Sequence, residues 1–133
     1  RLFGVYGPQE MQHRFITYAI KQNLKKEAIN INQNVIFDYL YVQDLCKIVE
    51  AFIKRAPKNR FINMTPTQSI DLVQISSIIN SVSAFKSPVN IVKQGLNNEY
   101  TGDNAVLRQE LPDFKFTSYQ EGIAKFYDYL KNL

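Results

Sequence analysis

The stretch VIFDYLYVQDL, from Val35 to Leu45, decides the fold class of this chain. Apolar and aromatic residues fill its first part on both alternating sets of positions, interrupted by Asp38. This pattern predicts a strand that is covered on both faces. Asp44 then lies where the first turn of a helix favours negative charge. The apolar stripe of that helix consists of Leu45, Ile48, Val49, Phe52 and Ile53. A buried strand that runs into an amphipathic helix is typical of α/β proteins.

Apolar spacing elsewhere predicts further strands and helices in alternation. The predicted strands cover residues 2–6, 28–31, 60–64 and 89–92, with a turn at 32–34. The predicted helices cover residues 9–24, 72–82 and 104–111 and the segment after Ser118. Thr67 or Ser69 is expected to cap the second of these helices, and Ser118 with Glu121 to form a capping box before the last. The alternation predicts one α/β domain over residues 1–133.

Composition places the chain among ordinary folded domains. It has 133 residues, enough for one hydrophobic core, and its single cysteine excludes an internal disulfide. Such cysteine usage suits a reducing compartment, and we expect a cytoplasmic protein. The net charge is +4, but the basic residues are scattered, so we expect no nucleic-acid partner. No apolar run is long enough to span a bilayer, so we expect no membrane partner.

The residues that carry chemistry are few. A glycine-rich phosphate loop is missing, and one histidine with one cysteine cannot form a zinc site. His13 is interpreted as a structural or surface residue, with a catalytic role as the alternative, and Cys46 as a small core residue. Asp38 and Asp44 are weak candidates for a pair of catalytic carboxylates. The residues alone therefore predict a binding module or part of an enzyme, with no catalytic residue and no metal site.

Four motifs in order along the chain resemble one enzyme family. They are RLFGVYGP, FDYLYVQDL, RFINMTPTQSIDL and FKFTSYQEGI. Together they are similar to the C-terminal part of the NAD-dependent epimerase/dehydratases, which are extended short-chain dehydrogenases acting on nucleotide sugars. The resemblance implies a Rossmann-type fold in which residues 1–8 belong to the last strand region of the cofactor domain. Residues 9–133 would form the substrate-binding portion.

The resemblance also explains the missing chemistry. In that family the glycine-rich loop and the Tyr-x-x-x-Lys pair lie upstream of the motif that contains Gly7 and Pro8. The chain would then be a fragment, inactive by itself, of an enzyme that transfers a hydride between a sugar carbon and NAD or NADP. A strand at the very start of the chain agrees with this expectation, because a strand needs neighbours. We expect such a fragment to self-associate as a homo-oligomer.

Two positions depart from the family pattern and shape the expected site. Phe37 stands where the family commonly has an arginine that binds the diphosphate, and Gly4 replaces a substrate-contacting asparagine. The resemblance implies Arg14 and Lys93 as the remaining cations, although Arg14 could equally be a solvated helix residue.

The same resemblance names the other expected contacts. It implies that Asn32, Asn98 and Tyr100 contact the substrate, and that Tyr6 and Gly7 contact the cofactor. Asn98 could instead belong to a turn without a ligand. The alternative function is a binding or interaction domain of the same fold without catalysis. A full open reading frame with an upstream glycine-rich loop would indicate the enzyme.

Overall fold

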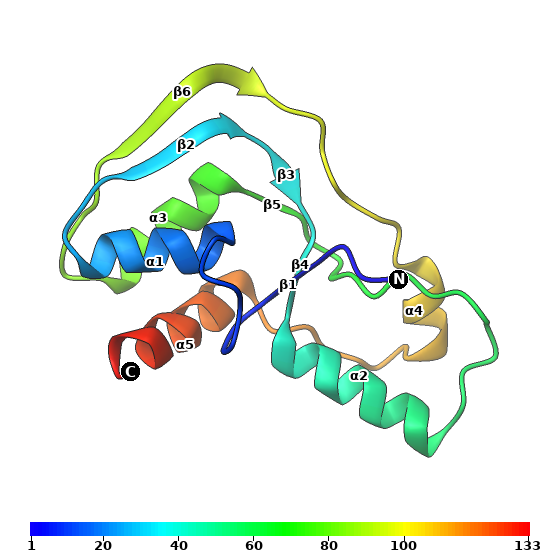
Figure 1. The fold of residues 1–133 in the computed structure, drawn as a ribbon. Helices are drawn as coiled ribbons and strands as arrows, with labels where there is room; N and C mark the ends of the chain where they lie inside the picture. The colour runs from blue at the N-terminus through cyan, green and yellow to red at the C-terminus, as the bar shows by residue number, and fades with distance from the viewer.

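The computed structural model describes residues 1–133 as six strands and five helices in alternation (Figure 1). The strands are β1 (Gly4–Tyr6), β2 (Ile29–Asn34), β3 (Ile36–Phe37), β4 (Tyr39–Tyr41), β5 (Ile70–Asp71) and β6 (Val89–Leu96). The helices are α1 (Phe15–Leu24), α2 (Val42–Lys54), α3 (Leu72–Val82), α4 (Ala105–Glu110) and α5 (Tyr119–Lys131). This order confirms the predicted α/β class.

The strands form three pairs. β1 pairs in parallel with β4, Gly4 opposite Tyr39, and β2 pairs in parallel with β6. The short strands β3 and β5 are antiparallel, with Phe37 opposite Ile70. Figure 1 shows β2 and β6 side by side above α1 and α3, with α5 below them and with α2 and α4 at the other end of the molecule. The β1–β4 pair lies between these two regions.

Each region has its own apolar core. The larger core packs α1, α3 and α5 against β2 and the β1–β4 pair, and its fully enclosed side chains include Ile16, Ile75 and Phe126. The smaller core joins α2, α4 and β4 through Leu40, Ile48, Ile62 and Leu107. Because β4 contributes to both cores, it fixes the two regions relative to each other.

Several strand boundaries differ from the prediction. The segment from Val35 is not one strand, because it breaks at Asp38 into β3 and β4. β2 continues through the predicted turn to Asn34, since β6 is longer than predicted and supplies its partners. Residues 60–64 form no strand and contribute one bridge, between Met64 and Leu2.

The helix starts differ as well. α1 begins at Phe15 and not at residue 9, because Glu10 lies before the helix and accepts the Thr17 N–H of its first turn. Asp71, not Thr67 or Ser69, caps α3 and forms a capping box with Gln74. Such a box satisfies two donors that a helix start leaves open.

Two further helices, α5 and α2, agree with the prediction only in part. Ser118 accepts the Glu121 N–H at 3.2 Å as expected, but the Glu121 carboxylate binds Lys125 and does not complete the box. On α2, Ile48 is buried, whereas Ile53 of the predicted stripe is 79% exposed. Cys46 is exposed on the same helix, so its assignment to the core was wrong.

None of the helices combines the length and the hydropathy that crossing a membrane requires. The His, Cys, Asp and Glu side chains nowhere gather in threes in an arrangement that could hold a metal ion.

Candidate functional site

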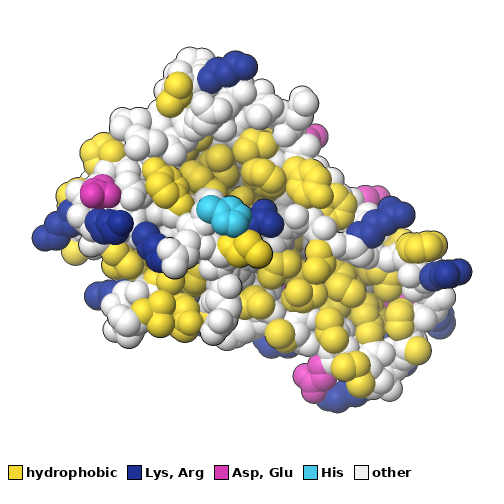
Figure 2. All heavy atoms as spheres, in the orientation of Figure 1, with side chains coloured by type: hydrophobic (Ala, Val, Ile, Leu, Met, Phe, Trp, Pro, Cys, Tyr) yellow, Lys and Arg dark blue, Asp and Glu magenta, His cyan; other side chains and the backbone are white.

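A cavity opens where β1, the start of α1, and the β3–β4 junction meet. We call it the aromatic cavity, and its volume is about 310 Å³. It is lined by Phe3, Gly4, His13, Arg14, Phe15, Phe37, Tyr39, Leu72 and Tyr100. Figure 2 shows the single histidine side chain near the middle of one face, with hydrophobic side chains around it. Cavities of a few hundred Å³ are typical of small-molecule sites.

Four rings form a continuous wall in this cavity. The centroids of Phe37 and Tyr39 are 5.1 Å apart, and those of Phe37 and Tyr100 are 6.1 Å apart. Phe3 continues the wall, with its centroid 5.3 Å from that of Tyr100. Gly102 makes room for Phe3, because a Cβ at Gly102 would lie 2.5 Å from the ring. These spacings are those of favourable aromatic pairs.

Asp38 holds the segments behind the wall together. Its carboxylate is buried and accepts the Ser69 hydroxyl at 2.6 Å and the Gly102 N–H at 2.7 Å. The backbone N–H of Tyr100 donates to the Ile36 carbonyl at 2.9 Å. Since a buried carboxylate is stable only with such donors, Asp38 has a structural role here. Asp38 and Asp44 have separate partners, so they do not form a carboxylate pair.

Tyr39 is positioned from the opposite side by Tyr119. The Tyr39 N–H donates to the Tyr119 hydroxyl at 3.2 Å, and that hydroxyl donates to the Gln68 carbonyl at 2.7 Å. Burial raises the pKa of Tyr39 to about 12, and it raises the pKa of Tyr119 further. Both phenols are therefore neutral donors at physiological pH.

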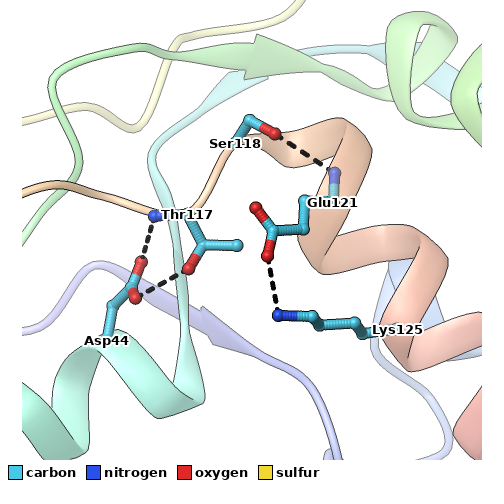
Figure 3. Close-up of polar contacts among 5 residues, drawn as sticks. All are labelled: Asp44, Thr117, Ser118, Glu121 and Lys125. Carbon is cyan, nitrogen blue, oxygen red and sulfur yellow. Dashed lines mark hydrogen bonds and ion pairs between the residues drawn. The ribbon is translucent and has the colours of Figure 1, made fainter.

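The segment before Tyr119 is tied to α2 by Asp44. The Asp44 carboxylate accepts the Thr117 N–H at 2.7 Å and the Thr117 hydroxyl at 2.8 Å (Figure 3). Ser118 then caps α5, and Glu121 pairs with Lys125 at 2.7 Å (Figure 3). These contacts fix the start of α5 and with it the support of Tyr39.

The charge in the aromatic cavity is positive. Arg14 is its permanent cation, no carboxylate lines it, and Arg14 forms no ion pair. Arg14 also lines a second cavity of about 310 Å³, which we call the turn cavity, along Val5–Met11 and Val42. The guanidinium therefore lies between two adjoining cavities and is available to an anion.

Glu10 is the acidic residue of the turn cavity. One of its carboxyl oxygens accepts the Thr17 N–H at 3.2 Å and the Thr17 hydroxyl at 2.6 Å. The other oxygen is buried and has no hydrogen-bond partner. Burial raises the pKa of Glu10, and the bonds from Thr17 and the charge of Arg14 oppose this only in part.

The structure brings some of the predicted site residues together and leaves others apart. Arg14 and Tyr100 line the aromatic cavity, and Gly7 lines the turn cavity. Tyr6 also borders the turn cavity, but its ring belongs to the core, and its hydroxyl points at Gly122 without a partner. The remaining three predicted residues lie exposed on or after β2 and β6, outside both cavities: Asn32, Lys93 and Asn98.

Sequence reasoning missed several residues of these cavities, among them Phe3, Tyr39 and Glu10. Phe3 and Tyr39 stand inside the quoted motifs, and the i, i+2 spacing of Phe37 and Tyr39 already puts both on one face of a strand. Nothing in the sequence indicated the contact between Glu10 and Thr17, because both residues were expected to lie in one helix over residues 9–24. His13 was interpreted as a structural or surface residue; its side chain is exposed and also lines the aromatic cavity.

Comparisons with known proteins show what part of the chain is similar to. Residues 1–65 match the model of the NAD dependent epimerase/dehydratase family. A comparison with curated proteins finds no match to the sequence. The first 65 residues are therefore similar to this family.

Solved structures share the fold over the whole chain. UDP-glucuronic acid 4-epimerase from Bacillus cereus, in complex with NAD, is 22% identical with a TM-score of 0.83, covering 99% of this chain and 43% of that one. dTDP-glucose 4,6-dehydratase from Bacillus anthracis str. Ames, in complex with NAD, is 13% identical with a TM-score of 0.81, covering 99% and 43%. An NAD-dependent NDP-hexosamine 5,6-dehydratase of tunicamycin biosynthesis is 17% identical with a TM-score of 0.78, covering 100% and 45%. The chain thus has a Rossmann-type fold of this group and spans less than half of these proteins.

Proposed function

We propose that this chain is the C-terminal, substrate-binding part of an NAD-dependent nucleotide-sugar epimerase or dehydratase. The observation that carries the proposal is the aromatic cavity with the unpaired Arg14 at its edge. An arginine without an acidic partner suits the diphosphate of a nucleotide sugar, because its planar fork binds two phosphate oxygens. The fold shared with enzymes whose names specify UDP-glucuronic acid and dTDP-glucose supports this assignment.

The chain's share of cofactor binding is small in this proposal. NAD would accept a hydride from a sugar carbon and return it. A cofactor pyrophosphate needs a glycine-rich turn that opens a helix, and the turn at Gly7 is followed by Pro8 and Glu10 before α1 begins. Gly7 has a φ of +133° and lies against Val42, so it can offer only backbone to the cofactor. NAD or NADP would be held mainly by an N-terminal portion of the full-length protein.

In this proposal the chain positions the nucleotide sugar, and Arg14 is the charged residue that contacts it. Orienting a substrate beside a cofactor can supply several kcal/mol of a reaction barrier. No side chain of either cavity is assigned a catalytic proton transfer, which in the family belongs to the Tyr-x-x-x-Lys pair. We therefore expect no product when this chain is incubated with NAD and nucleotide sugars, and measurable turnover would overturn the proposal.

Titration calorimetry with UDP-, GDP-, CDP- and dTDP-sugars tests the binding role. Arg14→Ala should weaken the best of them about tenfold, since a hydrogen bond to a charged group is worth about 1.5–3 kcal/mol. Lys25→Ala is the matched control: it removes an exposed cation at the far end of the same helix and should change nothing. Equal affinities for both variants would show that Arg14 is a solvated surface residue that does not bind the substrate.

Lys93 and the oligomeric state remain predictions. Lys93→Ala should weaken binding less than Arg14→Ala does, because an ammonium is a point charge and because Lys93 lies outside both cavities. Light scattering on the purified chain tests the expected homo-oligomer, and a monomer at high concentration would contradict it.

A further inference from the structure

Strand β6 forms an open edge of the molecule. It runs from Val89 to Leu96, and Figure 1 shows it as the outermost strand, with β2 on its inner side. β2 and β6 form a sheet of two strands, whose outer face carries the exposed side chains of Asn30, Asn90 and Val92. A parallel sheet is usually covered on both faces. The free edge of β6 can therefore take a further strand.

The register with β2 determines which backbone groups lie on that edge. Ile29 pairs with Val89 and donates its N–H to the Pro88 carbonyl at 2.8 Å. In a parallel ladder, the residues that flank Val89 then face β2, and every second residue from Val89 faces away from it. The backbone N–H and C=O groups of Val89, Ile91 and Lys93 accordingly point outward. None of the backbone hydrogen bonds outside the helices and strands uses them.

These outward groups are complementary to those of a second copy of the chain. If two β6 strands run antiparallel with Ile91 opposite its counterpart, Val89 lies opposite the partner's Lys93. Each residue with outward backbone groups then faces another such residue, as a hydrogen-bonded pair requires. Lys93 is the only charged residue of β6, and this register keeps the two lysines apart. On the outer face Val92, which is 75% exposed, would lie beside the partner's Asn90.

We propose that β6 is the interface between two copies of this chain, which pair antiparallel around Ile91. β2, β6 and their counterparts in the second copy then form one continuous sheet across a two-fold axis. Such an isologous contact uses the same surface on both copies and is closed, so assembly stops at the dimer. The interface lies outside the aromatic cavity and the turn cavity, so the inference goes beyond the proposed function and does not depend on it.

Ile91→Pro tests the edge directly. Proline removes the N–H at the two-fold axis, and because that N–H points away from β2, the strand should still form. Light scattering should show a dimer for the parent chain and about hundredfold weaker dimerisation for Ile91→Pro, since a carbonyl of each copy loses its donor. Ile53→Lys is the control, because it changes a largely exposed apolar residue of α2 and should keep the dimer. A monomeric parent chain at high concentration, a dimer that Ile91→Pro leaves intact, or one that Ile53→Lys abolishes would overturn the inference.

Disulfide trapping tests the register without a proline. Asn90 and the partner's Val92 would form a pair without hydrogen bonds, whose Cα atoms lie about 4.5 Å apart, within the span of a disulfide. Asn90→Cys combined with Val92→Cys, in a Cys46→Ser background, should therefore give a covalent dimer in oxidised glutathione. Val49→Cys in the same background is the control, because it places the thiol on the exposed face of α2 and should stay monomeric on a denaturing gel. Equal cross-linking of the control, or none through β6, would overturn the inference even where Ile91→Pro does not fold.

Discussion

Replacing Asp44 by alanine should remove one of the largest single contributions to the stability of this domain. Asp44 is 1% exposed in the first turn of α2, and both of its carboxylate oxygens accept from Thr117. The bonds of 2.7 and 2.8 Å join two segments that are 73 residues apart in the chain. In Asp44→Ala the Thr117 N–H and hydroxyl lose their acceptor.

The magnitude follows from these two bonds. A hydrogen bond to a charged group contributes about 1.5–3 kcal/mol, and the energy needed to bury the carboxylate offsets part of the sum. We expect Asp44→Ala to lower the free energy of unfolding by about 2–4 kcal/mol. Domains are typically stable by only about 5–15 kcal/mol, so the loss is a large fraction of the total.

Urea unfolding followed by far-UV circular dichroism measures this loss. With a slope of about 2 kcal/mol per molar urea, in the middle of the usual range, the midpoint should fall by about 1–2 M. Glu50→Ala is the control, because Glu50 also lies on α2 but forms only an exposed pair with Lys54. Exposed ion pairs of this kind contribute little to stability, so Glu50→Ala should hardly change the midpoint. An Asp44→Ala midpoint as close to the parent as that of Glu50→Ala would refute the reasoning.

Two further perturbations test the turn cavity. Burial raises the pKa of Glu10, so the stability linked to its protonated form is complete below the ordinary glutamate pKa and is lost as pH rises through the raised value. At pH 7 the urea midpoint of Glu10→Gln should therefore be higher than that of the parent chain, and at about pH 3.5 the two midpoints should be equal. Glu99→Gln, at an exposed position, is the control and should leave the midpoint unchanged at both pH values. Gly7→Ala puts a Cβ 2.7 Å from a Val42 methyl at a φ of +133°. This substitution should lower the free energy of unfolding by about 2 kcal/mol or more, which thermal unfolding measures. Gly95→Ala, whose Cβ would meet nothing within 4 Å at a φ of +81°, should cost less, and equal losses would show that the contact with Val42 is unimportant.

The sequence predicted the helices better than their starts. The stripes of α3 and α5 are local patterns, and their inward residues Ile75, Ile79, Ile123 and Phe126 are buried as the spacing indicated. The cap of α5 at Ser118 was predicted, but the starts of α1 and α3 involve hydrogen bonds that spacing does not reveal. For α1 that bond comes from Glu10, outside the helix.

The candidate site was predictable only in part for a similar reason. Arg14 and Tyr100 were identified through a family resemblance, but the aromatic wall, to which Tyr100 belongs, is assembled from rings far apart in the sequence. The break at Asp38 requires Ser69 and Gly102, which lie 31 and 64 residues further along the chain. A single-sequence pattern contains no information about such partners.

The adjacency of Phe37 and Asp38 follows from the alternation of side chains in an extended chain. Successive side chains point to opposite sides, so Phe37 and Tyr39 both reach the aromatic cavity while Asp38 points away from it. There Asp38 binds Ser69 and Gly102 and thereby holds Phe3 and Tyr100, the other half of the wall, in place. One short segment thus supplies two rings of the cavity and the carboxylate that positions the other two. Because Tyr39 also belongs to the main core, ligand binding at the wall and the stability of the fold should be coupled.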